Sequence, residues 1–195
     1  MQAIISTYHF SYRIMMKTLS STKVISHLNI LELLEISVTL IVAFYYQIIL
    51  HEIPYPLCLL QRVGIIMIGI GFLFNLIFGI NQRHYSIIIL SSITTCITVS
   101  RQVLIHILPD DPGYYSTVFG LHLYTWSLIF SLAIILFVCV LMLFNSAEIQ
   151  VAKSPAREIA IYLFVFLILA NLISTILECG LTQCVDNRTF YKLLN

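Results

Sequence analysis

The residues of this sequence best suited to chemistry are its five cysteines, because thiols exchange with disulfides and pass electrons. Cys58 lies at the start of a long apolar stretch, shortly after Pro54 and Pro56. If that stretch is a helix, its first unpaired N–H groups and its dipole favour an anion at this position. Arg62 follows four residues later, one turn away on the same face, and adds a positive charge near the sulfur. The pattern therefore predicts a stabilised thiolate at Cys58.

Cys179 and Cys184 lie near the other end of the chain, with four residues between them. Cys179 ends the last apolar stretch and follows Glu178, so the helix dipole and the neighbouring carboxylate both oppose a thiolate there. We therefore expect a disulfide between Cys179 and Cys184 to be the weaker oxidant, so that electrons entering at this pair run toward Cys58. The alternative is a structural disulfide that holds the tail, worth roughly 2 to 3 kcal/mol.

Long apolar stretches must position these cysteines. Of the 195 residues, 59% are hydrophobic and only 10% are charged, against roughly 25% charged in an average soluble domain. A helix of about 20 apolar residues crosses a bilayer, and continuous apolar runs favour helices over barrel strands. The sequence predicts an all-α, polytopic membrane bundle with five transmembrane helices in residues 28–178, between a lead (1–27) and a tail (179–195). The expected helices are 28–50, 59–80, 86–108, 119–144 and 157–178.

The basic residues predict the orientation of the bundle. Six of the ten fall in segments that would share one side, namely Arg13, Lys17, Lys23, Arg83, Lys153 and Arg157. Short segments rich in lysine and arginine stay in the cytoplasm, so the N-terminus is expected inside and the C-terminus outside. We interpret residues 1–27 as a cytoplasmic lead and not as a cleaved signal peptide. Cys58, Cys179 and Cys184 then all fall on the outer side, which in a bacterium is the oxidising one.

Several other side chains inside the spans have structural interpretations. Cys96 and Cys139 fall near the middle of the third and fourth spans and are expected to pack as small apolar groups. Asn75 and Asn171 are interpreted as interhelical hydrogen-bonding groups. Glu32, near the inner start of the first span, is expected to face the cytoplasmic interface.

The run around Cys58 resembles the signature of a known family. Residues 50–62, Leu-His-Glu-Ile-Pro-Tyr-Pro-Leu-Cys-Leu-Leu-Gln-Arg, are similar to the Pro-Cys-Pro-Leu-Cys-x-x-Gln-Arg signature of DsbB-type disulfide oxidases. The similarity covers most of residues 28–195, and its further matches are 101–106, 120–126, 177–180 and 186–187. The resemblance implies a bacterial inner-membrane oxidoreductase that reoxidises a periplasmic thioredoxin-fold protein of the DsbA type. It implies that the electrons pass to ubiquinone or menaquinone.

The resemblance also implies a place for the quinone and for the second cysteine pair. The quinone ring would lie near Cys58, where Arg62 could donate to a quinone oxygen or stabilise its reduced anion. Gln61 and Gln102 are further candidate contacts. Arg101, expected about 10 Å inside the third span, could supply a counter-charge or could extend outward to the surface. In the familiar four-span members the second pair lies between the third and fourth spans. The loop between the third and fourth spans has no cysteine here, so Cys179 and Cys184 in the tail would take the role of that second pair.

Tyr55 departs from the family signature, because it occupies the position of the first cysteine in Cys-x-x-Cys. A phenol cannot form a disulfide, so the usual two-pair relay cannot operate unchanged. Three explanations remain open: an introduced substitution, a natural three-cysteine relay, or a degenerate protein that is not an oxidase. In the relay, Cys58 would pair transiently with Cys179 or Cys184, and the remaining tail cysteine would resolve the mixed disulfide.

Two alternatives from other functional classes remain. One is a non-catalytic membrane partner that keeps the fold, an interpretation that Tyr55 supports. The other is a membrane cytochrome that binds haem through two of the histidines His51, His106 and His122. Haem would need two histidines that face each other across the bundle. Nothing in the sequence indicates a Gly-rich phosphate loop, a nucleic-acid surface or a metal cluster.

Overall fold

The computed structural model describes residues 2–51, 54, 56–106, 117–144 and 150–180, and the side chains among them from residue 22 onward except that of Phe144. Most of these residues are helical, which confirms the all-α class. The elements are α1 (Gln2–Ile48), α2 (Pro56–Phe78), α3 (Gln82–Ile105), β1 (Thr117–Val118), β2 (Leu121–His122), α4 (Leu123–Phe144) and α5 (Pro155–Cys179).

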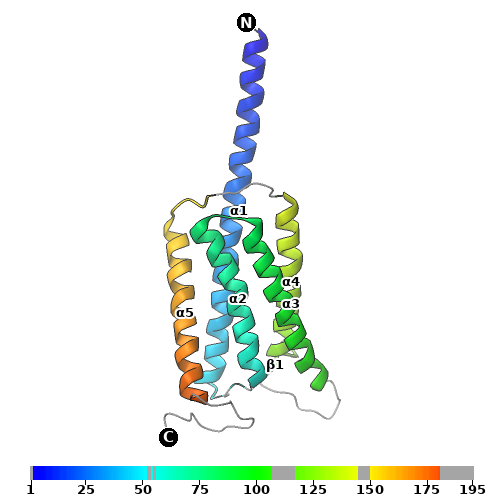
Figure 1. The fold of residues 1–195 in the computed structure, drawn as a ribbon, viewed down its shortest axis with the longest axis vertical. Coiled ribbons are helices and arrows are strands. Elements are labelled where there is room, and N and C mark those ends of the chain that lie inside the picture. The colour runs from blue at the N-terminus through cyan, green and yellow to red at the C-terminus, as the bar shows by residue number, and fades with distance from the viewer. Residues whose placement is uncertain (1, 52–53, 55, 107–116, 145–149, 181–195) are drawn as a thin grey trace.

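The five helices form an up-and-down bundle (Figure 1). All five contain a segment long and apolar enough to cross a membrane, as predicted. In α1 that segment is Thr22–Ile48, and α1 continues without a break from Gln2, so that its first part extends well beyond the bundle. The expected helix starting at residue 28 therefore begins much earlier in the structure.

Local capping groups set the helix ends that hydropathy alone placed a few residues away. The Asn81 side chain accepts a hydrogen bond from the backbone N–H of Arg83, at 2.9 Å, at the start of α3. Ser154 caps α5 in the same way, with Pro155 in the first turn. The helix expected at 119–144 begins only at Leu123, because the β1–β2 hairpin occupies the residues before it.

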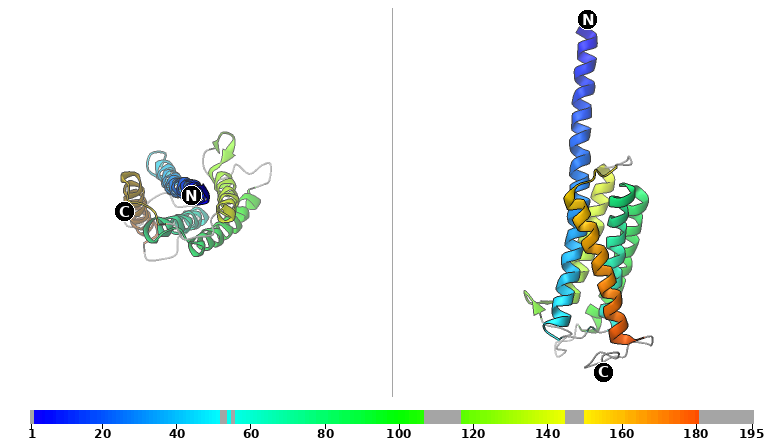
Figure 2. Two further views of the ribbon diagram at one scale, coloured as in Figure 1. Left: turned by 90° about the horizontal axis from the view of Figure 1, so that it is seen from above. Right: turned by 90° about the vertical axis from the view of Figure 1, so that its left-hand side faces the viewer.

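Helix α1 packs against α2 and α5, and α3 packs against α2 and α4 (Figure 2). We call the lower end of the bundle in Figure 1 the Cys58 end. It holds the last turns of α1, α3 and α5 and the first turns of α2 and α4. Both α1 and α4 pack on other helices and make little contact with each other, so the two remain apart at this end.

The buried core consists of aliphatic and aromatic side chains from all five helices, and includes Leu33, Ile36, Leu40, Ile68, Phe72, Ile88, Val138 and Phe164. The outward faces are equally apolar. Leu90, Leu136 and Leu143 are 66%, 69% and 80% exposed. A water-soluble monomer rarely exposes so continuous an apolar surface, whereas lipid tails cover it without cost. The fold is therefore that of a multi-pass membrane protein.

Close approach of the helices depends on glycines in α2. A Cβ atom added to Gly71 would lie 2.3 Å from Ile88 Cγ1 on α3, and one added to Gly69 would lie 2.2 Å from Phe164 Cζ on α5. Small residues let helix backbones approach in a membrane, where lipid offers no competing hydrophobic drive. Van der Waals contact therefore contributes much of the association of these helices.

A polar network joins α1, α2 and α3 at the end of the bundle opposite Cys58. Asn75 donates to Asn29 Oδ1 at 2.9 Å, and Asn29 donates to the Tyr85 hydroxyl at 2.9 Å. This confirms the interhelical role predicted for Asn75. The Asn171 amide instead donates to a backbone carbonyl of its own helix, that of Leu167, at 3.1 Å.

Glu32 lies inside the bundle, so the expectation that it faces the cytoplasmic interface is wrong. Its side chain is only 9% exposed, and Oε2 has no hydrogen-bond partner among the described residues. Its position follows from the helix period, since Glu32 lies three residues after Asn29 and one before Leu33, both fully buried.

Candidate active site

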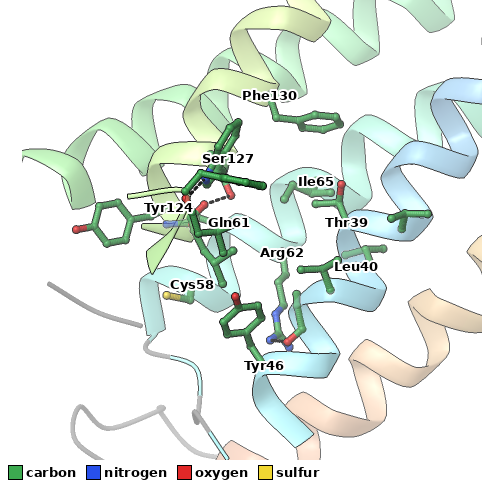
Figure 3. A pocket seen from close by; sticks show the side chains of 17 residues that line it. Thr39, Leu40, Tyr46, Cys58, Gln61, Arg62, Ile65, Tyr124, Ser127 and Phe130 are labelled. Carbon is green, nitrogen blue, oxygen red and sulfur yellow. Dashed lines mark hydrogen bonds between the residues drawn. The ribbon is translucent and has the colours of Figure 1, made fainter. Parts of the chain in front are cut away.

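Cys58 lies in the first turn of α2, where the chain enters the bundle. It is a thiol, and its side chain is 8% exposed. A pocket of about 470 Å³ opens beside it (Figure 3). Side chains from α1, α2, α4 and the hairpin line this pocket: Val38, Thr39, Leu40, Val42, Ala43, Tyr46, Cys58, Gln61, Arg62, Ile65, Val118, Phe119, Leu123, Tyr124, Trp126, Ser127 and Phe130.

The pocket is mainly apolar and aromatic, with few polar side chains. Its walls come from α1 on one side and from α4 with the hairpin on the other, the two parts of the bundle that remain apart. Trp126 donates from Nε1 to the carbonyl of Val118 at 3.0 Å and so ties the hairpin to α4. Phe119, at the hairpin turn, is 93% exposed. An apolar pocket with a few placed polar groups is typical of a site for a small hydrophobic molecule.

The Cys58 sulfur contacts an amide from α3. Gln102 Nε2 donates to Cys58 Sγ at 3.4 Å, and the Cys58 thiol can donate in turn to Gln102 Oε1 at 3.9 Å. Gln61 Nε2, one turn along α2 from Cys58, donates to Gln102 Oε1. Gln102 is fully buried and Gln61 is 5% exposed. Two helices thus bring one thiol and two carboxamides into a single hydrogen-bonded group.

Arg62 lines the same pocket but directs its guanidinium onto α1. Nη1 donates to Gln47 Oε1 at 2.5 Å and Nη2 to the carbonyl of Ala43 at 2.9 Å. The guanidinium carbon lies 5.5 Å from the ring centre of Phe44, a cation–π distance. These contacts fix a buried positive charge in the pocket wall, where the sequence predicted a positive charge on the face of α2 that carries Cys58 (Figure 3).

Gln47 is a site residue that the sequence analysis missed. Its side chain is 2% exposed, and besides accepting from Arg62 it donates to Ser174 Oγ on α5 at 2.8 Å. A glutamine near the end of an otherwise apolar span was the available signal, because a carboxamide in lipid requires a partner inside the protein.

Arg101 does not join this pocket, and the expected depth of about 10 Å is wrong. Helix α3 ends at Ile105 and not at residue 108, so Arg101 lies four residues from its end, or about 6 Å. Its side chain is exposed and lines a separate open hollow with Cys96 on the outward face of α3. Gln102, one residue later and about 100° further around the helix, turns inward instead.

The remaining cysteines divide into two groups. Cys96 and Cys139 are thiols, and Cys139 is exposed on the apolar surface instead of packing inside the bundle as expected. Cys179, the last residue of α5, is 3% exposed and disulfide-bonded, and it lies at the Cys58 end. Cys184 and Tyr55 lie outside the described residues.

Two of the three histidines considered for haem pack against one tyrosine. The His122 ring stacks on Tyr124 with centroids 5.1 Å apart, and the His106 ring lies 5.8 Å from the same ring. Neither histidine lines the pocket beside Cys58. Among the described residues, no group of three or more histidine, cysteine, aspartate or glutamate side chains is placed to hold a metal ion. This arrangement gives the haem alternative no support.

Comparison with known proteins supports the family resemblance of the sequence. Residues 26–113 match the family model of the disulfide bond formation protein DsbB. The matched region includes Cys58, Gln61, Arg62 and Gln102, and ends before α4 and Cys179. No curated protein and no solved structure matches the chain.

Proposed function

We propose that this chain, whose residues 26–113 match the DsbB family model and whose five apolar helices can span a membrane, is a DsbB-type inner-membrane protein. In this proposal it reoxidises a periplasmic, DsbA-like thioredoxin-fold protein and passes the electrons to a membrane quinone. The match to the DsbB family model supports an oxidoreductase of disulfide formation.

The observation that carries the proposal is the position of the Cys58 thiol in the wall of an apolar pocket that lies between α1 and α4. A hydrophobic electron acceptor from the bilayer would reach the sulfur there without crossing the aqueous phase. The ring would rest against Tyr46, Trp126 and Phe130, which supply aromatic and apolar surface. Arg62 and Gln61 are the polar groups of the pocket suited to a quinone oxygen, and Arg62 brings a fixed positive charge.

The overall reaction balances without a further reactant. The two thiols of the partner protein become a disulfide and release two electrons and two protons. A quinone, when bound, accepts two electrons and two protons to become a quinol. What this chain supplies is a thiol at Cys58, a buried cation at Arg62 and an apolar pocket that would hold the acceptor beside the sulfur.

The tail pair is proposed as the entry point for electrons. Cys179 is disulfide-bonded and lies at the same end of the bundle as Cys58, whereas Cys58, Cys96 and Cys139 are thiols. We therefore take Cys184 as its partner in the resting protein. With Tyr55 in place of a cysteine, turnover would use three sulfurs. Partner thiols reduce the Cys179–Cys184 bond to two thiols. Joining one tail sulfur to Cys58 as a disulfide then releases two electrons and two protons, which a quinone, when bound, would accept. The other tail thiol attacks this disulfide, which re-forms the Cys179–Cys184 bond and returns Cys58 to a thiol.

Quinone reduction by the purified protein, with a reduced DsbA-like donor, tests this function. The chain itself is compared with its Tyr55→Cys and Cys58→Ser variants, and with Cys139→Ser as a matched control, since Cys139 is an exposed thiol that does not line the pocket. Turnover by the chain that Cys58→Ser abolishes and Cys139→Ser leaves intact would support a three-cysteine relay. Turnover only in Tyr55→Cys would identify an oxidase scaffold disabled at one position. If none of the variants turns over, the oxidase proposal fails.

A further inference from the structure

We propose that Gln102 is the positioning residue that holds the Cys58 sulfur ready to ionise, and that Gln61 acts through Gln102 by fixing the orientation of its carboxamide. The inference concerns the same cysteine as the proposed function and gives it a specific activating group. Thiol reactivity is measured without quinone or protein partner, so a failure of one proposal is distinguishable from a failure of the other.

The contact between the Gln102 carboxamide and the Cys58 sulfur is asymmetric. A carboxamide has a donor side, Nε2, and an acceptor side, Oε1. The donor side is the nearer to Sγ, at 3.4 Å against 3.9 Å for Oε1. An N–H donor stabilises a thiolate, while a carbonyl oxygen accepts from a thiol and opposes ionisation. The observed orientation therefore favours the ionised form.

A hydrogen bond from Gln61 accounts for this orientation of the Gln102 carboxamide. Gln61 Nε2 donates to Gln102 Oε1. If the Gln102 carboxamide turned over, its NH₂ group would meet the NH₂ group of Gln61, and two donors would face each other. Gln61, which lines the pocket, therefore selects which end of the Gln102 carboxamide meets the sulfur.

The hydrogen-bonded group of Gln102, Gln61 and Cys58 is buried. Gln102, Gln61 and Cys58 are 0%, 5% and 8% exposed, so water has little access to the three polar groups. In such surroundings a hydrogen bond is stronger and an unpaired ionised group is costly. Arg62 donates to Gln47 and to the carbonyl of Ala43 on α1. Gln102 Nε2 donates to the sulfur directly from within this buried group.

The test is the pH dependence of alkylation of Cys58 by iodoacetamide. Rates at each cysteine of the purified full chain in detergent are measured by mass spectrometry between pH 6 and pH 10, with Cys139 as the internal reference. Gln102→Leu should slow alkylation of Cys58 about ten-fold near neutral pH, since a hydrogen bond to a charged group is lost. The rate should return to that of the parent at high pH, because the change acts on the thiolate fraction and not on access.

Gln61→Leu should slow alkylation about three-fold, and the double variant should behave like Gln102→Leu alone, because Gln61 acts only through Gln102. Gln102→Asn, one methylene shorter, should lose the contact while it keeps a polar side chain. Thr94→Val, on the exposed face of the same helix, should leave the rate unchanged.

An unchanged rate in both Gln102 variants overturns the proposal, as does a loss that persists equally at every pH, which would indicate altered access. If the rate losses of Gln61→Leu and Gln102→Leu multiply in the double variant, Gln61 acts independently of Gln102, and the role proposed for Gln61 is overturned. Circular dichroism of each variant reports folding independently. If Gln102→Leu fails to fold, the alkylation rate of Cys58 in the Gln102→Asn variant decides between these outcomes.

Discussion

Arg62 offers the sharpest test of the architecture at the Cys58 end. The substitution Arg62→Leu removes one hydrogen bond of 2.5 Å to Gln47 Oε1 and one of 2.9 Å to the Ala43 carbonyl. It leaves the Gln47 acceptor buried and the Ala43 carbonyl half-buried, and it removes the cation from the Phe44 ring, 5.5 Å away. Hydrogen bonds to charged groups contribute about 1.5 to 3 kcal/mol each, but their effects overlap. We expect Arg62→Leu to lower the free energy of unfolding by about 3 kcal/mol.

Arg62→Lys keeps the charge but replaces the planar fork with a single ammonium, and should lose about half as much. Arg101→Leu is the matched control, because Arg101 has the same side chain near the same end of the bundle but is exposed on the outward face. It should change the free energy by less than about 0.5 kcal/mol or should stabilise the protein.

The assay is a titration of the purified protein from mild detergent into sodium dodecyl sulfate, with helix content followed by circular dichroism. The free energy of unfolding of each variant is compared with that of the parent. Equal losses for Arg62→Leu and Arg101→Leu would refute the reasoning, since the first charge is buried and hydrogen-bonded and the second is exposed. An Arg62→Lys variant as stable as the parent would show that the bidentate geometry contributes nothing.

Three further substitutions test other parts of the structure. Asn75→Leu breaks the network that joins three helices and should cost roughly 1 to 2 kcal/mol in the same titration. Asn171→Leu, the same change at an amide that bonds its own helix, should cost less than half of that, and an equal cost would contradict the assignment. Gly71→Val places a Cβ 2.3 Å from a side chain of α3 and should cost about 1 to 3 kcal/mol, while Leu90→Val on the outward face should cost little. Trp126→Phe frees the hairpin and should speed amide exchange there about five-fold by mass spectrometry, and unchanged exchange would show that the indole bond does not hold it.

The sequence predicted the elements and the resemblance around Cys58 because both depend on local information. Apolar runs of more than 20 residues give the number of spans, and the proline–cysteine–arginine spacing around Cys58 gives the site its signature. Because Cys58, Gln61 and Arg62 lie within five residues on one helix, the structure had to bring them to the same wall of the bundle.

The partners of these residues came only from the tertiary structure. Gln102 is 44 residues from Cys58, and nothing in its local sequence distinguishes it from the neighbouring Arg101, which turns outward. The same holds for Glu32, which is buried, and for the two similar amides Asn75 and Asn171. The Asn75 amide donates to another helix, whereas the Asn171 amide donates to its own.

The physical reason is that a membrane removes the usual signal for helix rotation. In a soluble protein an apolar stripe marks the face that turns toward the core. Here the lipid-facing residue Leu90 and the fully buried Ile88 are equally apolar, so hydropathy fixes where a helix begins and ends but not how far it is turned about its axis. That rotation is set by contacts between helices, such as Gly71 against Ile88, and it decides which polar groups meet the sulfur of Cys58.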